Sequence, residues 1–178
     1  MGQTNDNRSI RISSLKKDDK DRFLLTYFRR NAREKFTKIS KQTGIPVTSI
    51  FDSLSRNDAK FVNRYTALID FKKMGYNSRV SIALKVNKKE KEEIKDFLMK
   101  NKKVNTLLRI NNGFDFMVEG IFEHVFELEE FLEQLEGNYD IKMKNIYYVI
   151  DELKKEEFLS DPDDFLFDRE LGSAVRQN

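Results

Sequence analysis

The chain has 178 residues, of which 39% are hydrophobic and 35% charged, so it can build one domain or two small ones. It has no cysteine, which excludes a disulfide framework and thiolate metal sites. It also has neither the run of about 20 apolar residues that spans a bilayer nor an apolar signal segment at its start, so we expect an intracellular, cytoplasmic protein.

The charge is unevenly distributed along the chain. Residues 1–77 contain 17 Lys and Arg against 8 Asp and Glu, whereas residues 78–178 contain 16 against 22. The net charge of +3 therefore combines a basic first part with an acidic second part. This asymmetry favours nucleic acid as a partner of the basic part, with uneven surface charge and no partner as the plain alternative.

Three short helices are predicted in the basic part, after a polar N-terminal tail that we expect to be flexible. Apolar side chains recur at helical spacing in each segment, and Gly44 can adopt the left-handed conformation that ends a helix. Asn57 tolerates a turn, which predicts an early end for the third helix. The predicted segments are the tail over 1–14, helices over 19–30 and 35–42, and a third helix from Thr48 to about Asn57.

The stretch KISKQTGIPVTSIFDSL, residues 38–54, has the spacing of a helix-turn-helix. Small Ser40 allows two helices to approach closely, Gly44 makes the turn, and Ile50 fills the core between them. An ordinary helical hairpin is the plain alternative, but it would not explain a third helix whose outward face is polar. Short polar side chains on such a face can reach base edges in a major groove. The predicted base-contacting residues are Thr48, Ser49, Asp52, Ser53 and Arg56.

Basic side chains around this motif are candidates for contacts with the phosphate backbone, which attracts Lys and Arg regardless of base sequence. The predicted phosphate-contacting residues are Arg33, Lys35, Lys41, Lys60 and Arg64. Double-stranded DNA is therefore the expected partner of the first part of the chain.

The second part of the chain has strand and helix patterns in the order β-α-β-β-α-β. Apolar side chains alternate with polar ones in the strand segments and recur at helical spacing in the helices. The residues NNG, 111–113, are a tight hairpin signal between the second and third strands. The predicted segments are strands over 79–86, 103–111, 114–118 and 140–150, and helices over 88–101 and 122–136. This order predicts a ferredoxin-like sheet with both helices on one face.

The helix-turn-helix, the segment NRYTALIDFKKMGYNSRVSIALKV and the βαββαβ order together resemble the Lrp/AsnC family of transcription regulators. The YTALID segment is similar to the family's connecting strand and hinge, and RINNGFDFMVEG resembles the hairpin of its RAM domain (regulation of amino acid metabolism). The resemblance runs from about Leu15 to Leu153. It implies an α+β fold with an N-terminal (winged) helix-turn-helix over 15–59, a connecting strand and hinge over 60–77, and a RAM-like βαββαβ domain over 78–153.

The resemblance also implies a regulator that forms dimers through its RAM sheets, larger rings such as octamers, and a site for an amino acid effector. Tyr147, Tyr148 and Phe116 are expected on the uncovered sheet face, which would be an unusually large apolar patch on a monomer. The connecting strand, residues 60–70, is expected to pair with its counterpart in the other subunit. Beyond the resemblance, residues 154–178 are either packed on a neighbouring subunit or a partly disordered acidic tail.

The effector is expected at the hairpin between the second and third strands. N–H groups of a Gly turn can hold a carboxylate, and the carboxylate of Asp115 can pair with an ammonium group. The plain alternative is that Gly113 only makes the turn and that Asp115 is a solvated strand residue. The predicted effector-binding residues are Asn112, Gly113, Phe114 and Asp115.

Patterns typical of catalysis are missing from the sequence, which has no P-loop and no G-x-G-x-x-G motif. The single His124 has Glu123 and Glu127 nearby, but one histidine among acidic residues is more typical of a surface than of a metal site. We therefore expect no enzyme, no cofactor, no metal and no membrane contact. Two other classes stay open: an architectural protein that binds DNA of any sequence without an effector, and a small-molecule sensor whose helix-turn-helix has lost its function.

Overall fold

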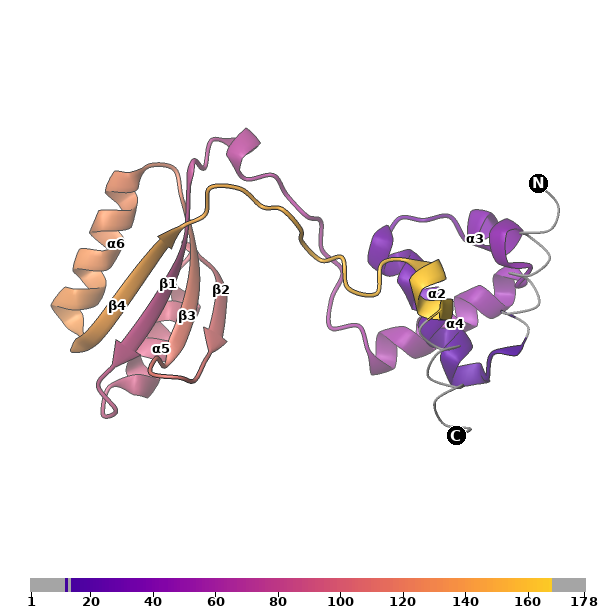
Figure 1. The fold of residues 1–178 in the computed structure, drawn as a ribbon, viewed down its shortest axis with the longest axis horizontal. Coiled ribbons are helices and arrows are strands. Elements are labelled where there is room, and N and C mark those ends of the chain that lie inside the picture. Colours follow the sequence, from indigo (N-terminus) through magenta and orange to yellow (C-terminus); the bar gives the residue numbers. More distant parts are fainter. Residues whose placement is uncertain (1–11, 13, 168–178) are drawn as a thin grey trace. The chain divides into compact units, whose positions relative to one another are not determined.

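The computed structural model describes residue 12 and residues 14–167, so most of the predicted N-terminal tail and residues 168–178 lie outside the described residues. The chain forms two compact units (Figure 1). The first unit combines Met1–Ala67 with Lys154–Asn178, and the second is Leu68–Leu153. The chain therefore passes from the first unit to the second and then returns.

The described part of the first unit is built around three helices, as the sequence predicts. Apolar side chains at helical spacing give each helix one buried face, and these faces meet in a common core around Phe23, Ile39 and Ile50. Gly44 ends the second helix with a φ of 72°, and its N–H donates to the carbonyl of Ser40 at 2.9 Å. The helices are α2 (Lys17–Arg30), α3 (Phe36–Thr43) and α4 (Val47–Lys60).

The predicted early end of the third helix is wrong, because α4 continues to Lys60. Asn57, where the helix was expected to end, is buried with 1% of its surface exposed. Its side-chain amide donates to the carbonyl of Asp21 at 2.7 Å. This bond holds the last turn of α4 against α2, so a residue that often favours turns here stabilises a helix.

The segment from Lys154 to Phe167, which we call the C-terminal segment, packs on the three helices of its own chain. Phe165 and Leu166 are 7% and 3% exposed, and the ring centroids of Phe165 and Phe23 are 6.2 Å apart. Upstream, Arg29 at the end of α2 forms an ion pair with Glu156. Within the described residues, 154–167, the segment thus contributes to the core of its own chain, which neither expectation for this part of the sequence included.

The residues at the start of the last helix explain why the C-terminal segment ends in a helix. Residues 162–167 are helical, and Asp161 precedes them as a cap whose carboxylate accepts the N–H of Asp163 at 2.8 Å. Pro162 occupies the first helical position, where a missing N–H costs nothing. The sequence DPDDFLF therefore starts a helix and places two apolar side chains, Phe165 and Leu166, where they can enter the core.

The second unit is a four-stranded antiparallel sheet with strand order β2-β3-β1-β4, and it confirms the predicted βαββαβ arrangement. One row of paired residues crosses the whole sheet from Leu107 through Val118 and Ile82 to Ile146. This row and its neighbours pack against both helices, which cover one face (Figure 1). The elements are β1 (Ser78–Val86), α5 (Lys91–Lys100), β2 (Val104–Arg109), β3 (Phe116–Phe122), α6 (Val125–Asn138) and β4 (Ile141–Tyr148).

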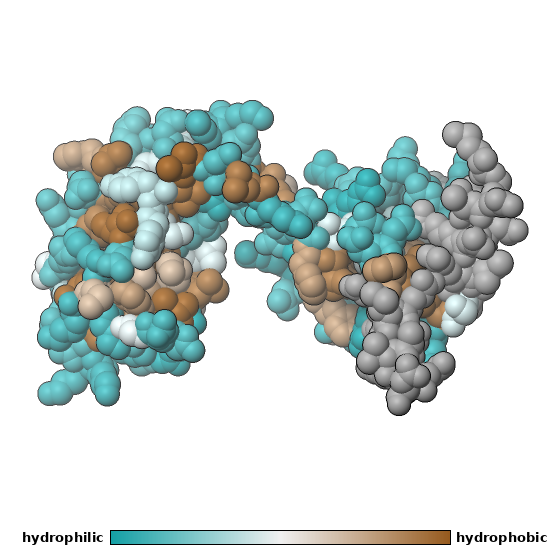
Figure 2. All heavy atoms as spheres, viewed as in Figure 1, coloured by the Kyte–Doolittle hydropathy of each residue, from teal (hydrophilic) through white to brown (hydrophobic). Residues whose placement is uncertain are grey.

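On the opposite face of the sheet, no helix packs among the residues that the structure describes, and we call it the open face. Its central row runs from Leu108 through Met117 and Ala83 to Asn145, one residue out of step with the buried row. Tyr147 of the same face is 54% exposed. Over the middle of this unit, Figure 2 shows apolar and near-neutral residues framed by hydrophilic ones.

The prediction that Phe116 lies on the open face is wrong. Phe116 pairs with Leu84 and is 2% exposed, because both side chains point toward the helices. Tyr148 pairs with Val80 and so belongs to the helix side as well, at the exposed edge of β4. Of the three aromatic residues expected there, only Tyr147 alternates onto the open face.

The segment between the two units is extended but forms no strand in this single chain. Residues 62–70 have no regular secondary structure, so the predicted connecting strand over 60–70 is absent from the monomer. A strand needs a neighbour to complete its hydrogen bonds, and none of the described strands pairs with this segment. A short 3-10 helix, η1 (Lys72–Met74), ends at Gly75 with a φ of 96° before β1 begins.

Candidate nucleic-acid interface and ligand groove

The first two turns of α4 present a polar, solvent-exposed surface. Thr48, Ser49 and Asp52 are all exposed, as the helix-turn-helix spacing predicts. The buried side of the same helix is anchored by Ile50, which has no exposed surface. The buried side of α4 therefore fixes the helix on its unit, and the exposed side offers short hydrogen-bonding side chains to the solvent. A helix that enters a major groove has this arrangement.

The other two predicted base-contacting residues are placed differently. Ser53 is 1% exposed, so the expectation that it lies on the outward face is wrong. Ile50, Ser53, Leu54 and Asn57 recur at i, i+3, i+4 and i+7, which is the spacing of one buried helix face, and this signal was present in the sequence.

The guanidinium group of Arg56 is paired with a carboxylate of its own unit. Its guanidinium donates to both carboxylate oxygens of Asp21, at 2.7 and 2.8 Å, and so joins α4 to α2. The hydrogen bond from Arg56 outweighs partial burial and lowers the pKa of Asp21 below its ordinary value. A forked pair of this kind is strong and oriented, so Arg56 positions the helix rather than reaching outward.

The five predicted phosphate-contacting residues are all exposed. Within the part of the chain that the structure describes, none of these five side chains forms an ion pair. Arg29, by contrast, is paired with Glu156 and also donates to the carbonyl of Phe158 at 3.3 Å. The basic residues of the first unit thus form two groups. The five predicted ones are available to bind an anion, whereas Arg29 and Arg56 hold parts of the unit together.

The hairpin between β2 and β3 is tight, as NNG predicts. Asn112 and Gly113 have φ values of 61° and 94°, and the N–H of Ile110 donates across the hairpin to Asp115 at 3.0 Å. Asn112 and Gly113 are exposed and Phe114 is half-buried, so the turn itself is open to solvent.

Asp115 is a buried anchor of the hairpin. It is 8% exposed, accepts hydrogen bonds from Lys91 at 2.6 Å and from the Val86 N–H at 3.1 Å, and lies 3.4 Å from the Lys85 ammonium. Burial alone would raise the pKa of Asp115, but the bonds from Lys91, Val86 and Lys85 lower it to about 2. This carboxylate therefore ties the hairpin to β1 and α5, and it has little capacity left for a ligand's ammonium group.

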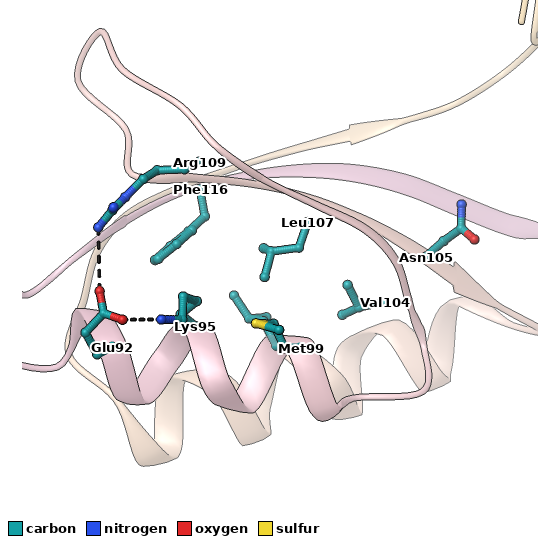
Figure 3. A pocket seen from close by; sticks show the side chains of 9 residues that line it. Glu92, Lys95, Met99, Val104, Asn105, Leu107, Arg109 and Phe116 are labelled. Atoms are coloured by element: carbon teal, nitrogen blue, oxygen red, sulfur yellow. Dashed lines mark hydrogen bonds and ion pairs between the residues drawn. The ribbon is translucent and has the colours of Figure 1, made fainter. Parts of the chain in front are cut away.

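A groove of about 540 Å³ lies beside the hairpin, between α5 and the edge strand β2 (Figure 3). Its floor and walls are apolar, with Leu98, Met99, Val104, Leu107 and Phe116 among the lining residues. One end carries a charged triad, which we define as Glu92, Lys95 and Arg109. The Glu92 carboxylate pairs with Lys95 and lies 3.6 Å from Arg109. No sequence pattern predicted this groove.

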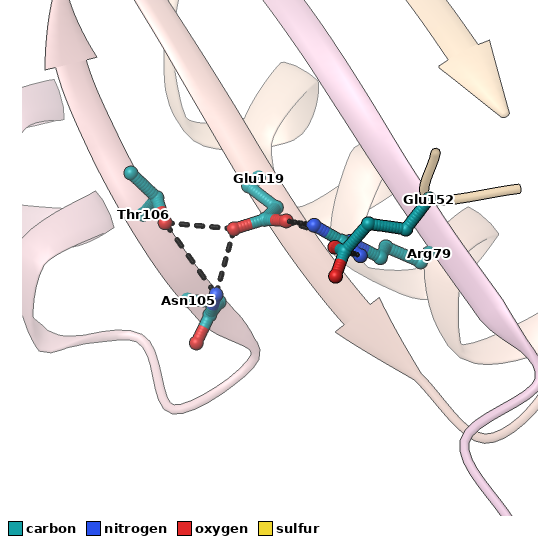
Figure 4. A network of polar contacts seen from close by, with 5 residues as sticks. All are labelled: Arg79, Asn105, Thr106, Glu119 and Glu152. Atoms are coloured by element: carbon teal, nitrogen blue, oxygen red, sulfur yellow. Dashed lines mark hydrogen bonds and ion pairs between the residues drawn. The ribbon is translucent and has the colours of Figure 1, made fainter. Parts of the chain in front are cut away.

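A polar network crosses the open face at the end where β1 begins (Figure 4). Glu119 accepts bonds from Arg79 at 2.6 Å, from Thr106 at 2.7 Å and from Asn105 at 2.6 Å, and Arg79 also pairs with Glu152. Burial would raise the pKa of Glu119, but these three donors lower it. The network fixes the residues just after β4 to the beginning of β1.

Among residue 12 and residues 14–167, no group of three or more His, Cys, Asp or Glu is placed to hold a metal ion. His124 is exposed and stands at the N-cap of α6. In the same residues, no helix is both long enough and apolar enough to cross a bilayer.

Comparison with known proteins supports the resemblance seen in the sequence, although no family model matches the chain. An uncharacterized HTH-type transcriptional regulator of Pyrococcus horikoshii is 22% identical over 146 residues, which cover 82% of this chain and 98% of the relative. The L-Met complex of a transcriptional regulator from Neisseria meningitidis has a TM-score of 0.71 at 18% identity and covers 80% of this chain and 94% of that one. AsnC of Escherichia coli has a TM-score of 0.68 at 15% identity, covering 79% and 96%.

The chain is therefore similar in sequence to helix-turn-helix regulators and has the fold of Lrp/AsnC proteins, as its motifs predict. The Pyrococcus and Neisseria proteins are named as transcriptional regulators and not as enzymes.

Proposed function

We propose that this protein is a cytoplasmic, DNA-binding transcription regulator of the Lrp/AsnC type. The observation that carries the proposal is the exposed polar start of α4, anchored by Ile50 and flanked by cations without ion pairs in the described residues. Thr48, Ser49 and Asp52 would contact base edges. Arg33, Lys35, Lys41, Lys60 and Arg64 would contact phosphates.

Two of the predicted base contacts have a different role in this proposal. Ser53 contributes to the packing of α4, and Arg56 orients that helix through Asp21. Asp52 is the acidic member of the exposed set, and it can accept a hydrogen bond from the amino group of cytosine.

The proposed assembly is a dimer formed through the open faces of two sheets. Tyr147 and Met143 are 54% and 53% exposed there, and Leu108 is 52% exposed on the same face. A second copy would cover these side chains around a two-fold axis, which matches the symmetry of a palindromic operator. Residues 62–70 would gain a strand partner in the same dimer. Larger rings, up to octamers, are proposed by resemblance to the family.

An amino acid is the proposed effector. The hairpin residues Asn112, Gly113 and Phe114 offer exposed backbone groups for a carboxylate, and the similar Neisseria regulator is described as a complex with L-Met. Asp115 would support this region as an anchor, because its carboxylate is already held by Lys91 and Lys85.

A sequence-selection experiment tests the DNA proposal directly. Purified full-length protein is incubated with random duplexes, and the retained pool is sequenced after several rounds. We expect an enriched pseudo-palindrome, and Ser49→Ala should shift the preferred bases while leaving folding intact. Lys102→Gln, an exposed change in the second unit, serves as the control.

A second function is favoured by one observation: with Ser53 buried and Arg56 paired, three of the five predicted base-contacting residues remain for base readout. An architectural protein that binds DNA of any sequence needs no more than the free cations. Retention of all duplexes without enrichment would support it, and no retention at all would mean that the helix-turn-helix has lost its function.

A further inference from the structure

We infer that residues 149–158, which return the chain from the second unit to the first, form a strap that limits how far the two units can move apart. In a dimer, this strap would also restrict the spacing between the two DNA half-sites that the protein accepts. The spacing role rests on the proposed function, whereas the strap itself does not. The resemblance to known regulators ends near Leu153, so the end of the strap lies beyond the shared fold.

The strap is held at both ends by ion pairs between arginine and glutamate. At the second unit, Glu152 pairs with Arg79 of β1, and the N–H of Val149 donates to the Arg79 carbonyl at 2.9 Å. At the first unit, Glu156 pairs with Arg29 of α2. The two glutamates are four positions apart in the chain, so their Cα atoms lie within about 14 Å of each other while both pairs hold.

Further contacts fasten the strap to the first unit. Arg29 also donates to the carbonyl of Phe158 at 3.3 Å, and Phe165 is buried in the core a few residues later. Glu156 and Leu159 have φ values of 55° and 58°, left-handed conformations that cost energy in any residue with a side chain. Such conformations persist only where surrounding contacts hold them, so this part of the chain follows a fixed path.

The first crossing, from α4 to β1, has a much longer free span. It leaves the first unit after the hydrogen bond from the Tyr65 hydroxyl to Asp58, and it reaches the second unit where the Asn77 N–H donates to the carbonyl of Glu123 at 3.3 Å. Among the described residues, those from 66 to 76 form hydrogen bonds and ion pairs only with one another or with Asn77. This span, which includes η1, reaches roughly 35–40 Å, so the strap sets the limit.

The short strap has a consequence for DNA binding by a dimer. If two chains are joined through their second units, each first unit reaches only as far along the DNA as its shortest tether permits. A tether that cannot span two sites contributes nothing to binding both of them at once. The strap therefore favours half-sites at one spacing, whereas the first crossing alone would allow several.

Distances between two spin labels test the strap without DNA. The chain has no cysteine, so Gln42→Cys in the first unit and Lys102→Cys in the second unit, both at exposed positions, give two defined labels. Labelled full-length chains are diluted with unlabelled ones, so that only distances within one chain are measured.

Two insertions of the same short Gly-Ser linker compare the crossings. One lies between Leu153 and Lys154 in the strap, and the other lies between Asp70 and Phe71 in the first crossing, which keeps residues 62–70 intact for pairing in the dimer. We expect the strap insertion to extend the measured distances by about 10 Å or more. The other insertion should leave them unchanged, because the strap still limits the separation. Equal broadening by both insertions, or no broadening by the strap insertion, would overturn the inference.

Point variants test the ion pairs without changing the length of the chain. The double change Glu152→Ala and Glu156→Ala frees the chain between Val149 and Phe158, which raises its reach from about 14 Å to about 30 Å. The measured distances should therefore broaden, and circular dichroism checks that the fold is kept. Glu157→Ala is the matched control, because this exposed carboxylate bonds Ser160 of the same turn. Unchanged distances in the double variant would overturn the short reach of the strap.

Selection from random duplexes then tests the spacing role. The unmodified protein and the variant with the longer first crossing should both enrich one spacing and bind neighbouring spacings at least about tenfold more weakly. The variant with the longer strap should bind several spacings with affinities within about threefold of one another. The same single spacing in that variant would overturn the spacing role.

The outcome can be separated from the fate of the proposed function. If no duplex is retained, the DNA-binding regulator fails and the spacing role fails with it, while the label distances still decide the strap. If one sequence is enriched but lengthening the strap changes neither the distances nor the spacing, the strap fails and the regulator stands.

Discussion

The two units of this protein complete their hydrophobic cores in different ways. The first unit closes its core with its own chain, because the C-terminal segment brings Phe165 and Leu166 back to α2. The second unit is continuous from Leu68 to Leu153 and packs its helices on one face of the sheet, leaving Tyr147 and Met143 exposed on the other. The first core is thus completed by its own chain, whereas the second leaves one face of its sheet exposed, which is the face of the proposed dimer.

The two units also differ in how their acidic residues pair with basic ones. In the first, Asp21, Glu156 and Glu34 pair with Arg56, Arg29 and Lys38, while the five predicted phosphate-contacting residues form no ion pair within the described residues. In the second, Asp115 and Glu119 join strands to their neighbours and are mostly buried. Acidic residues therefore decide which basic residues are available to an anion outside the molecule.

The largest effect is expected from removing a side chain that the C-terminal segment contributes to the core of the first unit. Phe165→Ala should reduce the free energy of unfolding of the first unit by roughly 3–5 kcal/mol, since it removes a buried ring and leaves a cavity against Phe23. Hydrogen exchange should show lost protection in α2 and α4 with β1 and β3 unchanged. Phe158→Ala, at a residue 81% exposed, is the matched control and should change little. Equal protection in both variants would mean that the C-terminal segment does not stabilise the unit.

The next effect concerns the open face. Tyr147→Asp should weaken the proposed dimer by about 2 kcal/mol or more, because an aromatic anchor is lost and a charge is buried at the interface. Sedimentation velocity over a concentration series measures the change. Tyr139→Asp is a poor control because its ring packs on Phe97, so the exposed Glu133→Gln on α6 is used instead. A wild-type protein that remains a monomer at micromolar concentration would contradict the proposed assembly.

A third prediction follows from Asp115. Its pKa in the folded protein is about 2, below the ordinary value of 3.8, so its ion pairs stabilise the second unit above pH 4. As the pH falls from about 4 to about 2, the carboxylate gains a proton and up to about 2 kcal/mol of this stabilisation is lost. Asp115→Asn should flatten the pH dependence of unfolding in that window, and the exposed change Asp151→Asn should not. An identical pH profile for Asp115→Asn would show that the lysine contacts contribute nothing.

The smallest effect separates free from committed cations in the first unit. Arg33→Gln should weaken binding to every duplex alike and reduce the slope of log affinity against log salt by about 0.9, the effect of one lost phosphate contact. Arg29→Gln should leave that slope unchanged, because Arg29 is paired with Glu156. Fluorescence anisotropy at several salt concentrations measures both. Equal slopes for the two variants would contradict the division of roles.

Much of the fold could be predicted from local sequence patterns. Apolar spacing identified α2, α3 and all four strands, and Gly44 and the NNG turn marked two boundaries, because helix caps and tight hairpins depend on one or two residues. The errors arose where a residue had two possible roles. Asn57 can end a helix or bond a neighbouring helix, and only the position of Asp21 decides between them.

The candidate sites were less predictable, because they depend on contacts between residues far apart in the chain. Exposure of Thr48 and Ser49 follows from helix periodicity, but the pairing of Arg56 with Asp21 joins residues 35 positions apart. The ion pair between Asp115 and Lys91 forms only when α5 packs on the sheet. The groove beside it depends on the same packing. Packing of the C-terminal segment on α2 leaves no periodic signal at all.

The discontinuous first unit has a consequence for synthesis on the ribosome. Phe165 emerges about 100 residues after the end of α4, which corresponds to roughly 5–20 seconds of translation. During that interval the three helices lack two side chains of their core, while the whole of the sheet unit is made and can fold. The surface proposed to bind DNA would therefore reach its full stability only in a chain translated past Phe165, so a nascent or prematurely terminated chain would compete poorly for operator sites.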